Sequence, residues 1–204
     1  MSRAAFRADD DGAVTVRLPS WLRRLLAEQL ADLDRLLADN DPTTAPAGGD
    51  PAGGDGAGDP AGAGADPLAA ITGLTGADGS PPEDPVLRRL RPAGYAEDAD
   101  PEASREFRRF TEADLAAVQR ARIATVRETV LAGDRVQLDP EQAQAWLGAL
   151  NDLRLALGTR LGVSEDLAAE PGPEHPLAGS YELYHLLGAL QHQLLVALGA
   201  PDEF

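Results

Sequence analysis

Three histidines are the only imidazole groups that could bind a metal or move a proton near neutral pH: His175, His185 and His192. His185 and His192 are seven residues apart and would share one face of a helix. No HExxH motif accompanies them. We therefore interpret the histidines as surface or partly packed side chains and predict no metal site.

Other catalytic chemistries lack their residues as well. The 204 residues contain no cysteine and no lysine, which excludes disulfides, thiolate metal sites, a thiol nucleophile and a lysine-dependent phosphate loop. No GxSxG or Ser-x-x-Lys motif is present, and no GxGxxG follows a strand. The sequence predicts a protein that is not an enzyme and that needs no cofactor.

Arginine provides the remaining chemistry. All 18 basic residues are arginine, against 34 acidic residues, and the net charge of −16 argues against salt-driven binding to nucleic acid or anionic membrane. Residues 104–160, however, are nearly neutral, so the net charge does not exclude a local basic patch there. The candidates for contact with a partner or with promoter DNA are Arg88, Arg89, Arg120, Arg122 and Arg127. The alternative is that these arginines form scattered salt bridges with the many acids.

A second polar group interrupts the apolar run 146–163 and consists of Asn151, Asp152 and Arg154. A charged group on a buried helix face must be paired. We therefore interpret the three residues as a buried polar clamp that joins this helix to the arginine-bearing helix expected over 112–131. The alternative interpretation is a spot that recognises a partner.

The N-terminal elements are a hairpin and a helix. Residues 6–8 and 14–18 flank a polar DDDG turn, and leucines at helical spacing follow from position 22 to position 37. Residues 40–66 contain eight glycines, four prolines and no large apolar side chain, which is typical of a disordered linker. We divide the chain into residues 1–39, which belong to the main domain, the linker 40–66, and the main helical domain 67–204.

The main domain is expected to start with a short helix or docked loop over 66–74, followed by a short helix over 84–95. Phe107 and Phe110 are expected to anchor the core, and the pattern Thr111-x-x-Asp114 predicts the start of a long helix that reaches about residue 131. A strand over 135–138 and a helix from Asp139-Pro140 to Gly162 follow. The last helix, about 177–199, carries one charged residue, so we expect it at the centre of the bundle or in a dimer seam.

Together these elements predict a mainly α fold, a helical bundle with a small two- or three-stranded β ribbon, assembled as a homodimer. A shift of 120 residues aligns Val16 with Val136, Leu30 with Leu150 and Leu33 with Leu153. This offset suggests a repeated strand-turn-helix unit, although any two leucine-rich helices can align by chance. The start of the sequence has no apolar run like that of a signal peptide, and 181–198 is too polar to span a membrane. We expect a cytoplasmic protein with no membrane partner.

Several runs resemble one known family when read in order. They are DPLAAITGL, DPVLRRLRPAGY, EFRRFTEADL, AWLGALNDLRLALGTRLGV and HPLAGSYELYHLLGALQHQLLVALG. They are similar to the actinobacterial AosR-like family, a domain-of-unknown-function family named for an oxidative-stress regulator. The resemblance covers nearly the whole chain except 40–66, and the WLGALNDLRLALG block is its most specific part.

The resemblance implies a cytoplasmic transcription regulator whose partner is an alternative sigma factor or the polymerase, and which induces cysteine-biosynthetic genes under oxidative stress. In the family's regulator, sensing is attributed to an N-terminal cysteine pair. This sequence has no cysteine, so thiol sensing does not carry over. The alternative that the resemblance leaves open is an adaptor or scaffold linked to Clp-type proteolysis, whose partner would be the Clp machinery.

Overall fold

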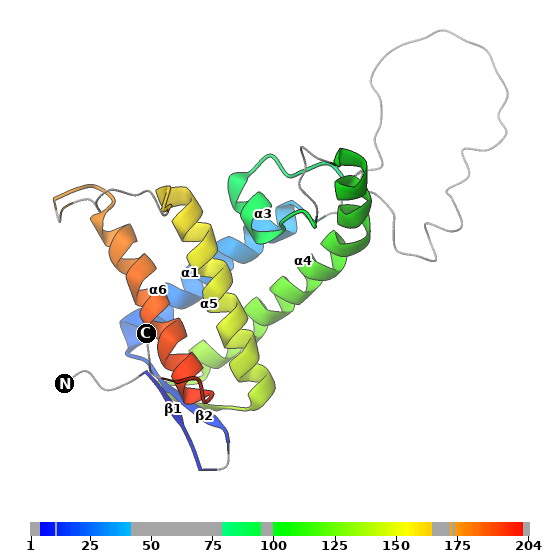
Figure 1. The fold of residues 1–204 in the computed structure, drawn as a ribbon. Helices are drawn as coiled ribbons and strands as arrows, with labels where there is room; N and C mark the ends of the chain where they lie inside the picture. The colour runs from blue at the N-terminus through cyan, green and yellow to red at the C-terminus, as the bar shows by residue number, and fades with distance from the viewer. Residues whose placement is uncertain are drawn as a thin grey trace, which may run out of the picture.

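The computed structural model describes residues 5–10, 12–41, 79–94, 100–164, 172 and 174–201. This part of the chain folds into five helices and three short strands (Figure 1). The strands are β1 (Phe6–Ala8), β2 (Val14–Arg17) and β3 (Arg135–Leu138), and the helices are α1 (Ser20–Asp39), α3 (Pro85–Leu90), α4 (Pro101–Ala132), α5 (Pro140–Leu161) and α6 (Ala178–Ala197). The predicted mainly α fold with a small β ribbon is confirmed. Most of the predicted linker 40–66 lies outside the described residues, so the division into domains stays a prediction.

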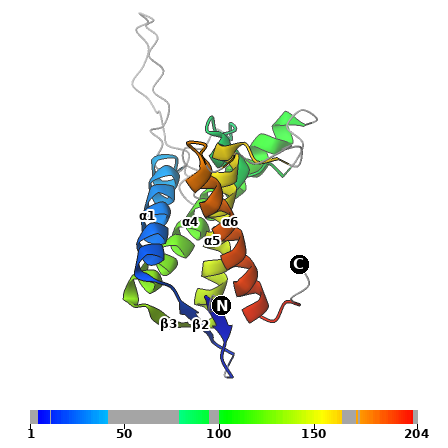
Figure 2. The same cartoon turned by 90° about the vertical axis from the view of Figure 1, so that its left-hand side faces the viewer.

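The three strands form one antiparallel sheet in the order β1-β2-β3. Figure 2 shows this sheet across one end of the helices. Phe6, Val14 and Val16 are buried, whereas Arg17 is exposed, which is the period of two expected of a sheet with one covered face. The sheet therefore closes one end of the hydrophobic core.

The pairing of β2 with β3 bears on the predicted repeat. Val16 lies directly opposite Val136, and Val14 lies opposite Leu138. Val16 and Val136 are also the residues that the offset of 120 makes equivalent. A local two-fold axis through this pair therefore relates β2 to β3 in the antiparallel register. Each strand is followed at once by a long helix, α1 after β2 and α5 after β3. The register therefore supports the predicted strand-turn-helix repeat.

Helix α5 is the centre of the bundle. It packs against α1, α3, α4 and α6, while α6 packs against α5 and β1. Leu195 and Leu198, at the end of α6, are more than one third exposed. The prediction that the last helix is central is therefore wrong, because a sequence poor in charge does not say how many neighbours a helix has. No helix in the described ranges combines the length and apolarity needed to cross a bilayer.

Local signals set the ends of α5 and the buried face of α1. Asp139 accepts a hydrogen bond from the backbone N–H of Gln142, whose side chain accepts one from the N–H of Asp139, which completes a capping box. Gly162 ends the helix with a φ of 67°. The predicted leucine stripe of α1 is buried throughout: Leu22, Leu26, Leu30, Leu33 and Leu37.

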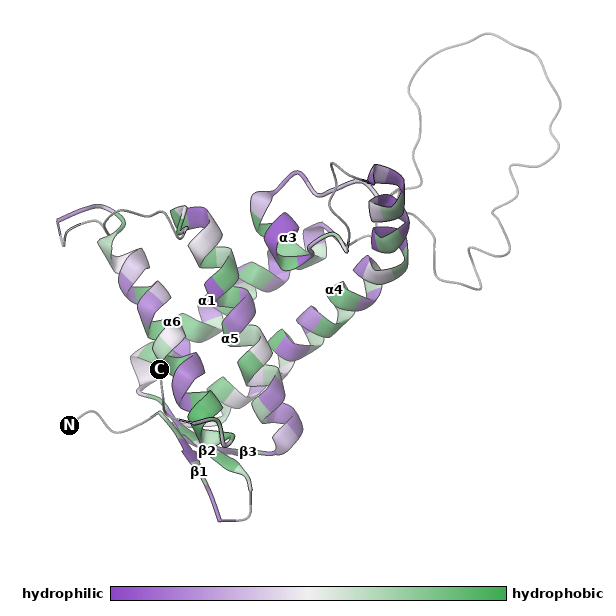
Figure 3. Cartoon of the chain, in the orientation of Figure 1, coloured by the Kyte–Doolittle hydropathy of each residue, from purple (hydrophilic) through white to green (hydrophobic). Residues whose placement is uncertain are grey.

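Helix α4 differs from its prediction. It is one helix of 32 residues that begins at Pro101, and Asp100 caps it by accepting from the N–H of Ala103. Thr111 lies inside the helix and donates its hydroxyl to the carbonyl of Phe107, so the predicted capping box is wrong. Phe107 and Phe110 are 37% and 59% exposed and do not anchor the core. In Figure 3, purple and green patches alternate along this part of α4.

Trp146 joins the sheet to the helices. Its side chain is fully buried on α5, and its ring meets that of Phe6 edge-on with 5.6 Å between the ring centroids. Its Nε1 donates to the hydroxyl of Thr129 on α4 over 2.9 Å. One side chain therefore contacts β1 and α4 from the central helix.

We expect the Trp146–Thr129 hydrogen bond to be energetically coupled. Trp146→Phe should lower the free energy of unfolding by about 2–4 kcal/mol, because it removes ring volume and the indole N–H. Thr129→Val should cost about 1–2 kcal/mol because it leaves the indole N–H unsatisfied. Urea denaturation followed by circular dichroism should show the double variant losing less than the sum of the two. Additive losses would contradict the coupling.

Candidate functional site

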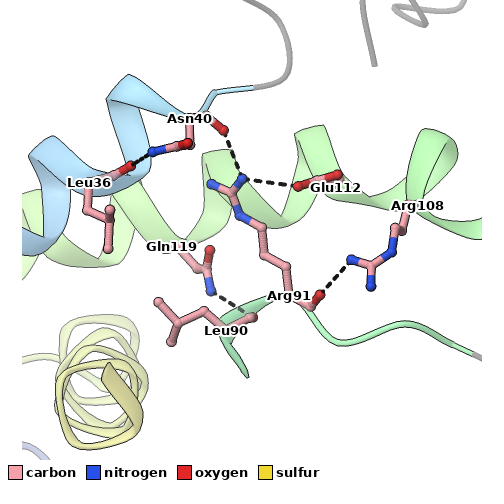
Figure 4. Close-up of polar contacts among 7 residues, drawn as sticks. All are labelled: Leu36, Asn40, Leu90, Arg91, Arg108, Glu112 and Gln119. Atoms are coloured by element: carbon pink, nitrogen blue, oxygen red, sulfur yellow. Dashed lines mark hydrogen bonds and ion pairs between the residues drawn. The ribbon is translucent and has the colours of Figure 1, made fainter. Parts of the chain in front are cut away.

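A buried arginine holds three segments together near the start of the predicted linker. Arg91 follows α3 and is 2% exposed. Its guanidinium donates to the backbone carbonyl of Asn40, at the end of α1, over 3.0 Å. The same nitrogen, Nη1, lies 3.3 Å from the carboxylate of Glu112 on α4, and Figure 4 shows both contacts. This ion pair therefore links α1, α3 and α4 where little water reaches it.

Two further side chains of α4 complete this cluster. Arg108 donates to the backbone carbonyl of Arg91 over 3.1 Å, and Gln119 donates to that of Leu90 over 3.2 Å (Figure 4). Carbonyls at the end of a helix lack partners within the helix, so α4 satisfies those of α3. The buried arginine cluster, consisting of Arg91, Arg108, Glu112 and Gln119, thus fixes the N-terminal half of α4.

The opposite side of the same half of α4 exposes apolar side chains. Phe107, Phe110 and Val118 are 37%, 59% and 45% exposed, and their spacing places them on one side of the helix. Gly94 lies against the ring of Phe107, where an added Cβ would come within 2.9 Å of the ring atoms. We call these three residues the α4 outer face. Because Arg108 and Glu112 lie on the covered side of the same turns, the buried cluster also orients the outer face.

The predicted contact arginines of α3 are both exposed. Arg88 donates to the backbone carbonyls of Pro82 and Glu83 over 2.8 and 2.9 Å. Arg89 makes no hydrogen bond or ion pair with any residue that the structure describes, and it faces a cavity next to α5. The two neighbouring side chains therefore have different surroundings.

The predicted contact arginines of α4 face other helices. Arg120 lies 3.2 Å from the carboxylate of Asp34 and 3.5 Å from that of Asp41. Arg122 lies along α5, and Arg127 has a buried Nε without a hydrogen-bond partner. Within the described ranges, the five predicted arginines do not come together on one surface.

The structure divides the predicted polar clamp between two neighbouring helices. Asn151 accepts a hydrogen bond from the side chain of Gln191 on α6 over 3.4 Å. The guanidinium of Arg154 lies 5.2 Å from the centre of the Tyr184 ring, also on α6. Asp152 instead faces α4. The three residues therefore do not form one clamp to α4, because consecutive positions of a helix point in different directions.

Asp152 is a buried carboxyl group beside an arginine. It is 7% exposed, and its Oδ2 has no hydrogen-bond partner. The side chain of Arg122 crosses α5 at Gly148, where a Cβ would lie 2.8 Å from its Cδ. Burial raises the pKa of Asp152 from 3.8 to about 6, although the charge of Arg122 opposes that shift. Asp152 therefore changes its charge in the folded protein at mildly acidic pH.

The three histidines differ in their exposure. His175 and His185 are exposed, and His192 is half-buried. Across the described residues there is no group of three or more His, Cys, Asp or Glu side chains that could hold a metal ion.

The sequence singled out Arg88 and Arg89, whereas Arg91 and Arg108 are the buried arginines. The spacing did contain a signal for Arg91, which lies four residues after the buried Leu87 and so shares its face of α3. The same kind of signal, a polar residue on an apolar face, predicts the polar group of α5. No comparable local signal marks Arg108, whose acceptor is a carbonyl from another segment.

We expect Asp152 to make stability fall as pH rises from about 4 to above 6. Because its folded pKa is raised above the unfolded value, the folded state holds the proton more tightly in this window, and the stability is lost as the proton leaves. Asp152→Asn removes that penalty, which is about 3 kcal/mol at pH 8. The free energy of unfolding of the variant, minus that of the unchanged protein, should therefore rise from pH 4 to pH 8. Urea denaturation at several pH values measures this difference, and a constant difference would contradict the prediction.

Comparisons with known proteins agree with one another. A family model described as "Domain of unknown function (DUF2017)" matches residues 3–198. The "Putative oxidative stress regulator AosR" of Mycobacterium leprae is 34% identical over 147 residues, 66% of this chain and 68% of that protein. The "Oxidative stress regulator AosR" of Mycobacterium bovis, like that of Mycobacterium tuberculosis, is 35% identical over 145 residues, 65% of this chain and 66% of the relative. No solved structure matches the chain.

The aligned parts span about two thirds of each relative. The predicted resemblance to the AosR-like family is thereby confirmed. Since the family model covers nearly all of the sequence, the chain belongs to the DUF2017 family.

Proposed function

We propose that this protein is a non-enzymatic regulator of the oxidative-stress response that acts by binding a protein of the transcription machinery, an alternative sigma factor or the polymerase. The support for regulation is the identity of 34–35% with proteins named oxidative stress regulators. The support for action through a protein partner is the α4 outer face. Large apolar side chains gathered on an exposed surface are typical of protein interaction sites.

The observation that carries the proposal is the exposure of Phe110 and Val118 on a helix whose other side is bound by the buried arginine cluster. Phe107 and Phe110 lie one turn apart, as do the anchors of a helix that binds in an apolar groove. The flanking exposed charges are mixed, with Arg109 and Asp114 beside the apolar side chains. A mixed rim around an apolar centre suits a protein partner better than the uniform negative charge of DNA.

The arginines favour the same partner class. Arg120 is held between Asp34 and Asp41, and Arg88 is bound to backbone carbonyls of its own segment. The charge of Arg120 is already balanced by two carboxylates, and two donors of Arg88 are already used, so both side chains have less to offer a phosphate. We therefore place the partner contact on the α4 outer face and treat promoter binding as the competing outcome. The predicted homodimer also stays a prediction.

We expect Phe110→Ala to weaken binding to the partner by about tenfold or more, because exposed aromatic anchors carry much of the binding free energy at interfaces. The partners to test are the purified alternative sigma factors of the source organism and its RNA polymerase core, measured by biolayer interferometry. The matched control is Leu131→Ala, because Leu131 is also on α4 and is equally exposed at 59%. Both variants should unfold at nearly the same urea concentration as the unchanged protein.

Three results would refute this proposal. The first is that none of these purified proteins binds, and the second is that both variants weaken binding equally. The third is salt-dependent DNA binding that Phe110→Ala leaves unchanged, which would favour the promoter instead. Binding to the Clp machinery alone would support the adaptor interpretation and contradict the transcriptional one.

We also propose that the protein receives its stress signal without a thiol of its own. The sequence has no cysteine and a single methionine, so peroxide has almost no sulfur to oxidise. Treatment of the purified protein with peroxide should change its affinity for the partner by less than about twofold. The measurement is the affinity for the partner before and after peroxide treatment of this protein alone, with the partner left untreated. A larger change would contradict it.

A further inference from the structure

A cavity of about 770 Å³ lies between α5, α6 and α3, and it is separate from the α4 outer face. Its lining includes Arg89 of α3, Arg154 and Thr159 of α5, and Tyr184 of α6. Pockets that bind small molecules commonly have volumes of about 300–1,000 Å³. The cavity is therefore large enough for a small organic ligand.

Two glycines allow Tyr184 and Arg154, which line this cavity, to pack closely against the neighbouring helices. A Cβ at Gly158 of α5 would lie 3.0 Å from the ring of Tyr184, so the ring rests directly on the backbone of α5. A Cβ at Gly188 of α6 would lie 3.6 Å from Nε of Arg154, so the arginine side chain crosses α6 at that glycine. Tyr184 and Arg154 are thus held against each other, with the guanidinium over the ring.

The charge of the lining is opposite to that of the chain. Among the described residues of the lining, the two charged ones, Arg89 and Arg154, are both arginines, although the sequence has 34 acidic residues and 18 basic ones. Neither arginine makes a hydrogen bond or ion pair with the described residues, and Nε of Arg154 is buried without a partner. Two guanidinium charges that no described carboxylate balances would be stabilised by a bound anion here.

The C-terminal carbonyls of α5 do not strongly repel an anion in the cavity. Carbonyls at a helix C-terminus carry partial negative charge when they are unpaired. Here, the carbonyl of Gly158 accepts from the N–H of Val163, that of Thr159 accepts from Gly162, and that of Leu161 accepts from the hydroxyl of Tyr181. These contacts satisfy three of the carbonyls beside the cavity.

We propose that this cavity binds a small organic anion whose phosphate or carboxylate group lies between the guanidinium groups of Arg89 and Arg154. Arginine binds both groups through paired N–H donors, and phosphate offers it more acceptor oxygens. The edge of the Tyr184 ring and Leu155 provide an apolar wall for the organic part of the ligand. This inference does not depend on the proposed transcriptional partner.

The test is a calorimetric titration of the full chain with inorganic phosphate, pyrophosphate and citrate, each at matched ionic strength. We expect saturable binding of at least one of them, and the comparison of the phosphates with citrate identifies the preferred anionic group. Arg89→Gln should weaken that binding by about tenfold, the effect of losing a charge-assisted hydrogen bond. Because Arg89 is exposed, this variant is expected to fold normally.

The matched control is Arg88→Gln, which removes a neighbouring exposed charge that does not line the cavity. It should leave the affinity unchanged to within about twofold, whereas Arg154→Gln should weaken it as Arg89→Gln does. Equal losses in the Arg88 and Arg89 variants would show only a general charge effect and overturn the proposal. Absence of saturable binding for all three anions would overturn it as well. If Arg154→Gln does not fold, the comparison of Arg88 with Arg89 still decides the outcome.

Discussion

The structure depends on the burial of one indole ring. Trp146 is fully buried on the central helix and satisfies its N–H by donating to the hydroxyl of Thr129 on α4. The ring of Trp146 also packs edge-on against the ring of Phe6, and this contact holds the sheet against α5. With α5 held against both the sheet and α4, α3 and α6 can pack on its remaining sides.

The sequence predicted best where the signal was local. The leucine spacing of α1 and the Asp139-Pro140 cap of α5 are features of a few consecutive residues, and both agree with the structure. The start of α4 shows the limit of such signals. Thr111 has the pattern of a cap, but Asp100 and Pro101 begin the helix earlier, and Arg108 on the added turns donates to the carbonyl of Arg91, which follows α3. Contacts between distant segments decide such cases.

The candidate sites were harder to predict for the same reason. Arginines occur in groups along this sequence, and nothing within a group says which guanidinium is buried. Arg91 is buried because the carbonyl of Asn40, 51 positions away, and the carboxylate of Glu112 both meet it. The cavity likewise needs Gly158 and Gly188 to be small at two places where different helices touch. The spacing of residues within one helix does not predict such contacts between different helices.

The repeated strand-helix unit shows how surroundings, rather than residue type, set the chemistry. With the offset of 120 residues, Asp152 corresponds to Asp32, yet Asp32 is exposed and paired with Arg35 on its own helix. Asp152 is buried because α5 is covered on several sides, whereas α1 packs mainly against α4. The arginine of the cavity, Arg154, corresponds to an acid, Asp34, in the first unit. The offset is consistent with the pairing of β2 with β3, and the two halves differ in the burial of Asp152 and in the charge at position 154.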